Sequence, residues 1–174
     1  MRIAVTGTPG TGKSTATDLL GDDYDVVHLN DVIREEGLTV ERDEERDSLV
    51  ADLDAVASRL DDYDPDPDAE HVVVDSHLAH RFDADRVVVL RCRPDVLEER
   101  LLDRGEPEPK ARENRESEAL DVVLAEAVDR HGTESVYEID ATDASPSDVA
   151  AAIEAVASGE RDPSAGDVDF VAYR

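Results

Sequence analysis

The sequence is poor in lysine, aromatic side chains and cysteine. Of its 18 basic residues only Lys13 and Lys110 are lysines, tryptophan is absent, and aromatic residues make up 3% of the chain. The single cysteine, Cys92, excludes an intrachain disulfide and lacks the partners of a structural zinc site. We therefore expect Cys92 to be a small residue near the end of a strand and not a reactive thiol.

Long apolar runs are also missing. No stretch approaches the 18 consecutive apolar residues that a transmembrane helix requires. Residues 1–6 form a short apolar run that leads directly into glycines, without the basic region and cleavage site of a signal peptide. We therefore expect no membrane contact and a cytoplasmic location. The 174-residue length fits one domain with a core of its own.

Positive charge is scarce. Acidic residues number 45 against 18 basic ones, which gives a formal net charge of -27. No broad basic patch exists, so direct binding of nucleic acid is not expected. At about 1 M salt the Debye length falls to about 3 Å, which screens this repulsion. We interpret the acidity as a halophilic adaptation to a salt-rich cytoplasm. An acidic face for a basic partner is compatible with the same composition.

Apolar runs alternate with helical patterns along the chain, which predicts an α/β fold with a parallel sheet covered by helices. Asn30 is the expected N-cap of a short helix that Gly37 ends, and Gly105 ends a later one. The tail after Gly159 is polar, and its place cannot be assigned. The helix over 48–60 is expected because Leu49, Leu53, Val56 and Leu60 recur at helical spacing. The expected strands are 2–6, 26–29, 72–75, 86–91 and 136–139, and the expected helices are 13–20, 31–36, 48–60, 94–104, about 110–130 and 145–157.

Residues 7–14, with the sequence GTPGTGKS, match the G-x-x-x-x-G-K-[ST] phosphate-loop pattern. The loop has the required context, an apolar strand before it and a helix after it. Its glycines let backbone N–H groups turn toward a phosphate without Cβ clashes. Lys13 is expected to reach the β- and γ-phosphates of ATP, and the Ser14 hydroxyl to coordinate Mg²⁺. The loop therefore predicts a P-loop NTPase that catalyses phosphoryl transfer from Mg-ATP.

A second acidic position follows the apolar run 72–74. Ligands gather at the carboxyl ends of parallel strands, so Asp75 is expected to face the phosphate loop and hold a magnesium-bound water. His77 follows two residues later. It is a candidate for orienting a water or hydroxyl, or for coupling magnesium binding to movement. A solvated or locally hydrogen-bonded histidine is the plainer alternative, and His80 is a nearby competitor.

Arginine grips phosphate oxygens in pairs, so the arginines are the candidates for substrate phosphates. Arg34, on the short helix after the second strand, is a candidate for the acceptor phosphate. Arg104, before the loop 105–109, is a candidate for a lid contact to ATP, and Arg112 and Arg115 follow it. Exposed arginines are commonly only part of a solvated face, and the pattern alone leaves that alternative open.

Four segments together resemble the adenylate kinase isoenzyme six family, which includes a coilin-interacting nuclear ATPase and short archaeal relatives. The resemblance covers about residues 1–157, and its most discriminating piece is the D-S-H triplet at 75–77, which common adenylate kinases lack. The segments are GTPGTGKST, HLNDVIREEGL, VVVDSHLAH and LLDRGEPEPKARENRESEAL.

The resemblance implies a five-stranded parallel sheet in one P-loop kinase domain spanning 1–174. It implies an acceptor region at about 28–51 that includes Arg34, a short lid at about 103–113, and catalytic roles for Asp75 and His77. The implied ATP-binding residues are Gly10, Gly12, Lys13, Ser14, Thr15 and Arg104. The phosphate loop departs from long adenylate kinases by continuing Lys-Ser-Thr where they show Lys-Gly-Thr. The acceptor region contains one candidate arginine, Arg34, which leaves nucleotide specificity open.

Two functions follow from these observations. The first is a nucleoside-monophosphate kinase that transfers the γ-phosphate of Mg-ATP to AMP or another nucleoside monophosphate, with ATPase activity beside it. The second, drawn from the resemblance, is an ATPase that assists small-subunit ribosome maturation and rRNA processing through a basic ribosomal protein. A regulatory GTPase is disfavoured because the N-K-x-D guanine motif is missing: Lys110 is preceded by Pro109.

Overall fold

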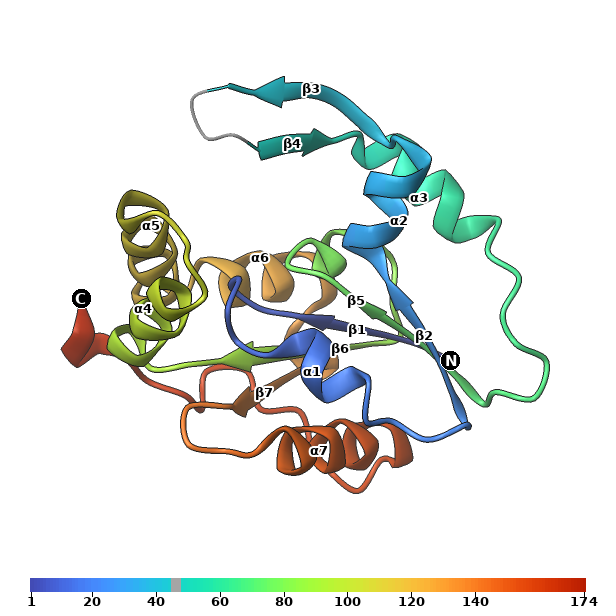
Figure 1. Ribbon diagram of the computed structural model, residues 1–174. Helices are drawn as coiled ribbons and strands as arrows, with labels where there is room; N and C mark the ends of the chain where they lie inside the picture. Colours follow the sequence, from blue (N-terminus) through green and yellow to red (C-terminus); the bar gives the residue numbers. More distant parts are fainter. Residues whose placement is uncertain (45–47) are drawn as a thin grey trace.

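The computed structural model describes residues 1–44 and 48–174 (Figure 1). Its centre is a five-stranded parallel sheet, which confirms the predicted α/β fold class and places all five predicted strands within two residues. The strand order is β2 (Tyr24–His28), β5 (His71–Asp75), β1 (Arg2–Thr6), β6 (Arg86–Arg91) and β7 (Val136–Asp140). Because β1 lies between β5 and β6, the turns that follow β1 and β5 meet at the same edge of the sheet.

Helices cover both faces of the sheet. Ile3 and Val5 contribute to a core with α1 (Lys13–Thr17) and α7 (Pro146–Ser158). Ala4 points to the opposite face, as the alternation of side chains along a strand requires. The helices on that face are α2 (Leu29–Glu36), α3 (Leu53–Asp61) and α6 (Val122–His131).

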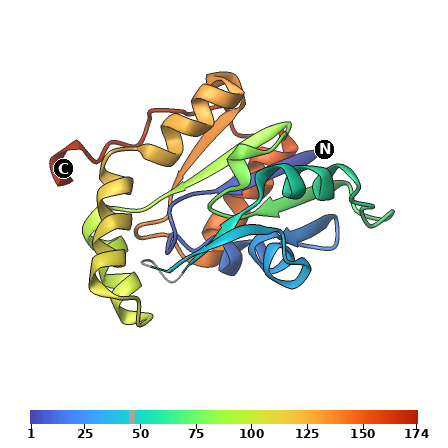
Figure 2. The same cartoon turned by 90° about the horizontal axis from the view of Figure 1, so that it is seen from above.

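The helices α4 (Pro94–Asp103) and α5 (Glu108–Ala119) form a pair with a small core of their own. The pair stands at one end of the sheet, opposite the N-terminus (Figures 1 and 2). The strands run from the N-terminal end toward this pair, so their carboxyl ends lie near it. Within the described residues no helix is long and apolar enough to cross a membrane.

The predicted helix over 48–60 is wrong in its first part. Strand β4 (Ser48–Ala51) pairs antiparallel with β3 (Thr39–Asp43), and helix α3 begins only after Asp52. The Asp52 side chain accepts a hydrogen bond from the Ala55 backbone N–H, which fixes the helix start. Leu49, which helical spacing had placed on an apolar face, is instead exposed on the hairpin.

Three helix ends also differ from the sequence prediction. Asn30 is not an N-cap, because α2 begins one residue before it; its side-chain oxygen accepts a hydrogen bond from the Ser76 hydroxyl. Helix α1 ends at Thr17, and Leu19 and Leu20 continue it only through i→i+3 bonds. The long helix expected over about 110–130 is broken at Asp121, whose φ of 55° is left-handed and separates α5 from α6.

The polar tail after Gly159 packs along the edge strand β7. Ser164 donates its backbone N–H to the Val136 carbonyl, and its hydroxyl accepts from the Glu138 backbone N–H. The tail ends in a single 3₁₀ turn, η3 (Val171–Tyr173), next to the buried ring of Phe170. The tail thus covers part of an edge whose backbone groups would otherwise face solvent.

Candidate active site

The phosphate loop connects β1 to α1 and is packed tightly on two sides. Gly7 and Gly10 have φ values of 146° and 93°, which favour glycine. A Cβ on Gly7 would lie 2.6 Å from the Leu90 carbonyl oxygen, and one on Gly10 would lie 2.9 Å from the Leu101 side chain. The loop is therefore pressed against β6 and α4, and neither glycine can be replaced without moving backbone or core side chains.

Lys13 curls over this loop. Its ammonium donates to the carbonyl oxygens of Gly7 at 2.9 Å and Thr8 at 3.2 Å. Burial lowers the pKa of Lys13 to about 8 against the opposing effect of Asp75 and Glu118, and the positive charge of Arg104 lowers the pKa further. The ammonium is therefore held inside the loop by two carbonyls.

Ser14 and Thr15 are exposed on the first turn of α1. Gly12, directly before Lys13, has a φ of 92° and open space around it. Gly12, Ser14 and Thr15 are therefore accessible to a ligand at the start of α1.

Asp75 ends β5 beside this loop and is nearly fully buried. Its Oδ2 accepts a hydrogen bond from the Thr17 hydroxyl at 2.5 Å and one from Nδ1 of His28 at 2.8 Å. Among the described residues both bonds fall on Oδ2, which leaves Oδ1 able to bind a ligand. Asp75 is thus placed where the sequence predicted, and α1 and β2 fix its orientation.

His28 ends β2 and lies between two carboxylates. Its Nε2 is 2.9 Å from Oδ1 of Asp18, and its Nδ1 contacts Asp75. Burial lowers the pKa of His28, but the charges and hydrogen bonds of Asp75 and Asp18 outweigh it and raise the pKa above the ordinary value. The ring bridges both carboxylates through its two nitrogens and links the buried Asp75 to the surface of α1.

His77 lies two residues after Asp75 and is half-buried. Burial, followed by the nearby charge of Lys13, lowers the pKa of His77 to about 4. The ring is therefore neutral at pH 7 and able to accept a hydrogen bond or a proton. Ser76 fixes the turn that carries it, because its hydroxyl donates to Asn30 at 2.7 Å and accepts from the Leu78 N–H at 3.0 Å.

His80, the alternative histidine, is fully occupied by protein partners. Its Nδ1 lies 2.7 Å from the Thr6 hydroxyl and its Nε2 lies 2.8 Å from a carboxylate oxygen of Glu126. The side chain is 2% exposed. It therefore supports the end of β1 and offers no free nitrogen to a substrate.

The candidate arginines are placed differently from one another. Arg104 caps the C-terminus of α4, pairs with Glu106 at 3.5 Å, and lies close enough to lower the pKa of Lys13. Arg34 is exposed on α2 and pairs with Asp31 at 3.5 Å, so its guanidinium is not gathered with the loop. The other two pair with glutamates: Arg112 with Glu108 within α5, and Arg115 with Glu98 between α5 and α4.

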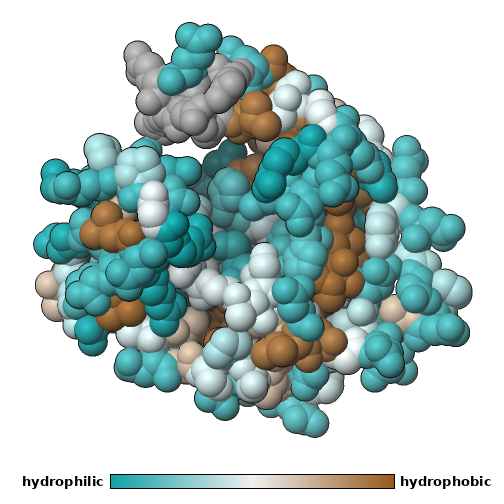
Figure 3. Space-filling view, viewed as in Figure 1, coloured by the Kyte–Doolittle hydropathy of each residue, from teal (hydrophilic) through white to brown (hydrophobic). Residues whose placement is uncertain are grey.

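A cleft lies between the α4–α5 pair and the β3–β4 hairpin with α2 and α3 (Figure 3). The hairpin and α2 form the region 28–51, of which residues 45–47 lie outside the described residues. Residues 103–113 form the turn from α4 into α5 and the start of α5. The cleft is therefore bounded by the two segments predicted to bind the acceptor and to act as a lid.

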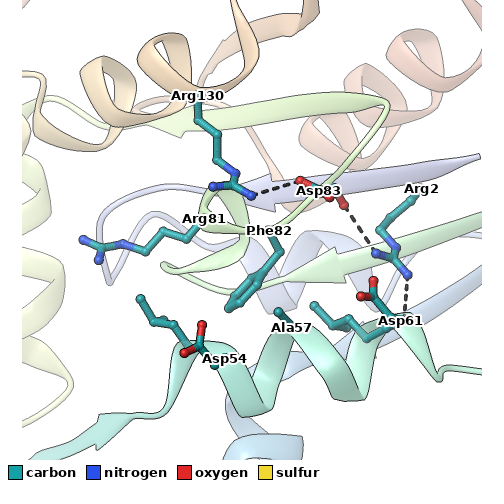
Figure 4. A pocket seen from close by; sticks show the side chains of 10 residues that line it. Arg2, Asp54, Ala57, Asp61, Arg81, Phe82, Asp83 and Arg130 are labelled. Carbon is teal, nitrogen blue, oxygen red and sulfur yellow. Dashed lines mark hydrogen bonds and ion pairs between the residues drawn. The ribbon is translucent and has the colours of Figure 1, made fainter.

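A separate cavity of about 290 Å³ lies between α3 and the segment before β6 (Figure 4). Three arginines line it, and each is bonded to the protein. Arg2 donates to the Leu60 carbonyl at 2.7 Å, Arg130 to Asp83 at 2.9 Å and Arg81 to Glu126 at 3.1 Å. The three arginine side chains of this cavity are thus already hydrogen-bonded to other parts of the protein.

The sequence did not predict the two residues that hydrogen-bond to Asp75, Thr17 and His28. Thr17 lies one helical turn after Lys13, so the predicted helix already placed it on the same face. His28 ends the second predicted strand, but only the strand order shows that this strand neighbours β5. Glu118, whose carboxylate contacts Thr8 of the loop, carries no local signal at all.

The oxygen donors of Ser14 and Asp75 suit Mg²⁺, which prefers hard oxygen ligands and keeps several waters or phosphate oxygens. Within the described residues there is no group of three acidic, histidine or cysteine side chains that could hold a metal by itself. The fit is therefore to a magnesium ion shared with a nucleotide and not to an all-protein metal cage.

The sheet order and the glycine loop between β1 and α1 define an α/β P-loop NTPase. The fold is similar to a crystal structure of shikimate kinase from Bacteroides thetaiotaomicron, with a TM-score of 0.52 and 17% identity, over 92% of this chain and 98% of that one. Residues 3–121 match a family described as AAA domain, and the chain belongs to this family.

Its relatives include archaeal proteins that carry the name "Putative adenylate kinase". One from Natronomonas pharaonis is 67% identical over 173 residues, and one from Halobacterium salinarum is 55% identical over 174; both matches cover 99% of each chain. A third, from Methanosarcina acetivorans, is 41% identical over 90% of this chain and 86% of the relative.

Proposed function

We propose that the protein is a nucleoside-monophosphate kinase that transfers the γ-phosphate of Mg-ATP to a nucleoside monophosphate, with AMP as the first candidate. The observation that carries this proposal is the meeting of three charged groups at one edge of the sheet. Lys13 lies inside a complete phosphate loop, with Asp75 at the adjacent strand end and Arg104 close by. The names of the archaeal relatives support the same activity.

The chain's own contribution is positioning and charge neutralisation, because phosphoryl transfer asks for little covalent chemistry from the protein. Gly10, Gly12, Lys13, Ser14 and Thr15 would bind the phosphates of ATP. Ser14 and Asp75 would hold Mg²⁺, directly or through a bound water, and the ion would neutralise charge on the moving phosphoryl group. Thr17 and His28 keep the Asp75 carboxylate aimed at this position.

The two segments beside the cleft would supply the acceptor site and the closure. Arg34 would bind the acceptor phosphate, which requires it to exchange its exposed pairing with Asp31 for the substrate. Arg104 in the lid would contact ATP from the other side. Closure of the turn at 103–113 would exclude water from the transferred group.

A second function is favoured by one specific observation, the neutral His77 beside Lys13. A neutral imidazole at this position suits the orientation of an attacking water. We therefore propose as the alternative an ATPase of the isoenzyme six type, which acts in the cytoplasm on small-subunit ribosome maturation. Its net charge of -27 would suit a basic ribosomal protein as partner.

Product analysis separates the two functions. ADP formation from Mg-ATP is measured in molar KCl with and without AMP, and the products are resolved by chromatography. Consumption of AMP with two ADP formed per event supports the kinase. ADP and free phosphate formed at the same rate without AMP would contradict it and favour the ATPase.

A further inference from the structure

Glu118 links the phosphate loop to the sheet. It comes from the last turn of α5 and is 2% exposed. Its Oε2 accepts a hydrogen bond from the Thr8 hydroxyl at 2.6 Å, and its Oε1 accepts from Nε of Arg91 at 2.8 Å and from the Cys92 backbone N–H at 3.1 Å. One buried carboxylate thus connects the loop, the end of β6 and α5.

Three further bonds within the loop end on the carbonyl oxygen of Thr8. Its carbonyl oxygen accepts from the Lys13 ammonium at 3.2 Å and from both the backbone N–H and the hydroxyl of Thr11, at 3.3 and 3.0 Å. A displacement of Thr8 therefore shifts the groups that hold Lys13. Thr8 is 1% exposed, so its hydroxyl has Glu118 as its partner instead of water.

Arg91 holds Glu118 in place from the opposite side. Its guanidinium also donates to Glu138 at 2.5 Å and to Asp121 at 2.6 Å. The second oxygen of Glu138 accepts from the backbone N–H groups of Gly166 at 2.7 Å and Val168 at 3.2 Å. The tail thus supplies the outermost layer of a buried polar network that ends at the phosphate loop.

Three carboxylates surround the single guanidinium of Arg91. Those of Glu118 and Glu138 are fully buried, and that of Asp121 is partly buried. Removal of one partner from such a cluster leaves an unpaired buried charge, which is costly. If Glu118 served only to neutralise Arg91, its two oxygens would need no partner in the phosphate loop. Here one carboxylate oxygen is instead directed at a loop side chain, and that bond is charge-assisted and therefore strong.

We propose that Glu118 is a positioning residue for the phosphate loop: through its bond to Thr8 it presets the loop in the shape that binds the phosphates of ATP. This inference rests on the proposed function, because it presumes that the loop binds Mg-ATP. The gain comes from preorganisation, since a loop already held in shape loses less conformational freedom on binding. Glu118 itself does not touch the nucleotide.

The test measures the dissociation constant of Mg-ATP by isothermal titration calorimetry in molar KCl, which requires no turnover. Thr8→Val keeps the shape of the side chain and removes its hydroxyl. We expect it to weaken binding about tenfold, the scale of a lost hydrogen bond to a charged group. Glu118→Gln should weaken binding by a similar factor. Thr8→Ser, which restores the hydroxyl, should bind within about twofold of the unmodified protein.

The double variant Thr8→Val with Glu118→Gln should bind no more weakly than the weaker single variant, because both changes remove the same charge-assisted bond. Asp121→Asn is the matched control: it removes the charge of a different partner of Arg91 without touching the loop, and we expect no change in Mg-ATP binding. Loss of affinity in Asp121→Asn equal to that in Glu118→Gln would assign the effect to general loosening and overturn the proposal.

Equal affinity of Thr8→Val and Thr8→Ser would also overturn it. If Glu118→Gln fails to fold, this Thr8 pair decides the matter alone. If the unmodified protein does not bind Mg-ATP at all, the proposed function fails instead, so the two failures are distinguishable.

Discussion

At the scale of single residues, Lys13 is the group on which every proposed activity depends. It is the only lysine of the loop, and its ammonium already occupies the loop's inner surface. Lys13→Ala should abolish kinase and ATPase turnover alike, by at least about a thousandfold, because the charge that stabilises the moving phosphoryl is lost. ADP formation with and without AMP measures this. Arg130→Ala, which removes a cation of α6 that pairs with Asp83, is the control. Turnover retained in Lys13→Ala would contradict the assignment of the loop.

His77 should behave as a neutral ring across the physiological range. Its pKa near 4 lies below that of an unfolded chain, about 6.5. Between these values the unfolded chain binds a proton that the folded state refuses, so this residue lowers stability as pH falls from 6.5 toward 4. Titration of the histidine ring signals by NMR in molar KCl should show the His77 signal unchanged from pH 8 to 5.5. His28, with its raised pKa, is the internal contrast. A His77 midpoint near 6.5 would contradict the burial argument.

The water-handling role of His77 has a separate kinetic test. His77→Ala should slow hydrolysis of ATP without acceptor more than it slows transfer to AMP, because only hydrolysis needs an oriented water. Both rates are measured on the same preparation. An unchanged ATPase rate would exclude this role and weaken the alternative function.

Cys92 should be inert in the folded protein. It is fully buried in the core of α4 and α5, and burial raises the pKa of its thiol to about 11. The thiolate that reacts with disulfide reagents is therefore scarce at pH 8. Labelling should be absent in molar KCl and complete in urea. Rapid labelling of the native protein would show that α4 and α5 open locally.

At the scale of elements, the tail is a structural part of the domain. The Phe170 ring is buried and lies 5.3 Å from the Arg91 guanidinium, so it covers the network from outside. Phe170→Ala should lower the free energy of unfolding by about 3 kcal/mol. Urea unfolding in molar KCl measures the change, with Val171→Ala, at an exposed neighbouring position, as control. Equal stabilities for the two variants would mean that the tail is only loosely attached.

The elements also show which parts of the site were predictable. The phosphate loop and Asp75 depend on local strand–turn patterns, and the sequence placed both. The region 48–60 was read as one helix because Leu49, Leu53, Val56 and Leu60 have helical spacing. That spacing does not reveal that Asp52 caps the helix, or that residues before it pair with β3.

Contacts between segments that are far apart in the sequence could not be predicted from it. Thr8 and Glu118 are 110 positions apart, and His28 and Asp75 are 47 apart. Neither pair has a local pattern, and each meets only because the sheet order brings its elements together. The break at Asp121 is of the same kind: the bonds from Arg91 and Arg174 hold this aspartate in the left-handed conformation.

At the scale of the whole molecule, stability should depend strongly on salt. The repulsion within a net charge of -27 reaches over about 10 Å at 0.1 M salt and over only about 3 Å at 1 M, because charges farther apart than this are screened. The urea midpoint should therefore rise steadily from 0.1 to 2 M KCl, as followed by circular dichroism. A midpoint independent of KCl would show that the acidic surface serves another purpose, such as a basic partner.

Helix α5 also connects the proposed lid to the phosphate loop. Its twelve residues span about 18 Å; one end lies in the segment 103–113 and the other is fastened by Glu118. A rigid rod fastened at one end moves its free end through a wide arc while the fastened end barely shifts. In the proposed kinase, closure over the cleft would therefore move the start of α5 most and the end at Glu118, beside the loop that binds ATP, least.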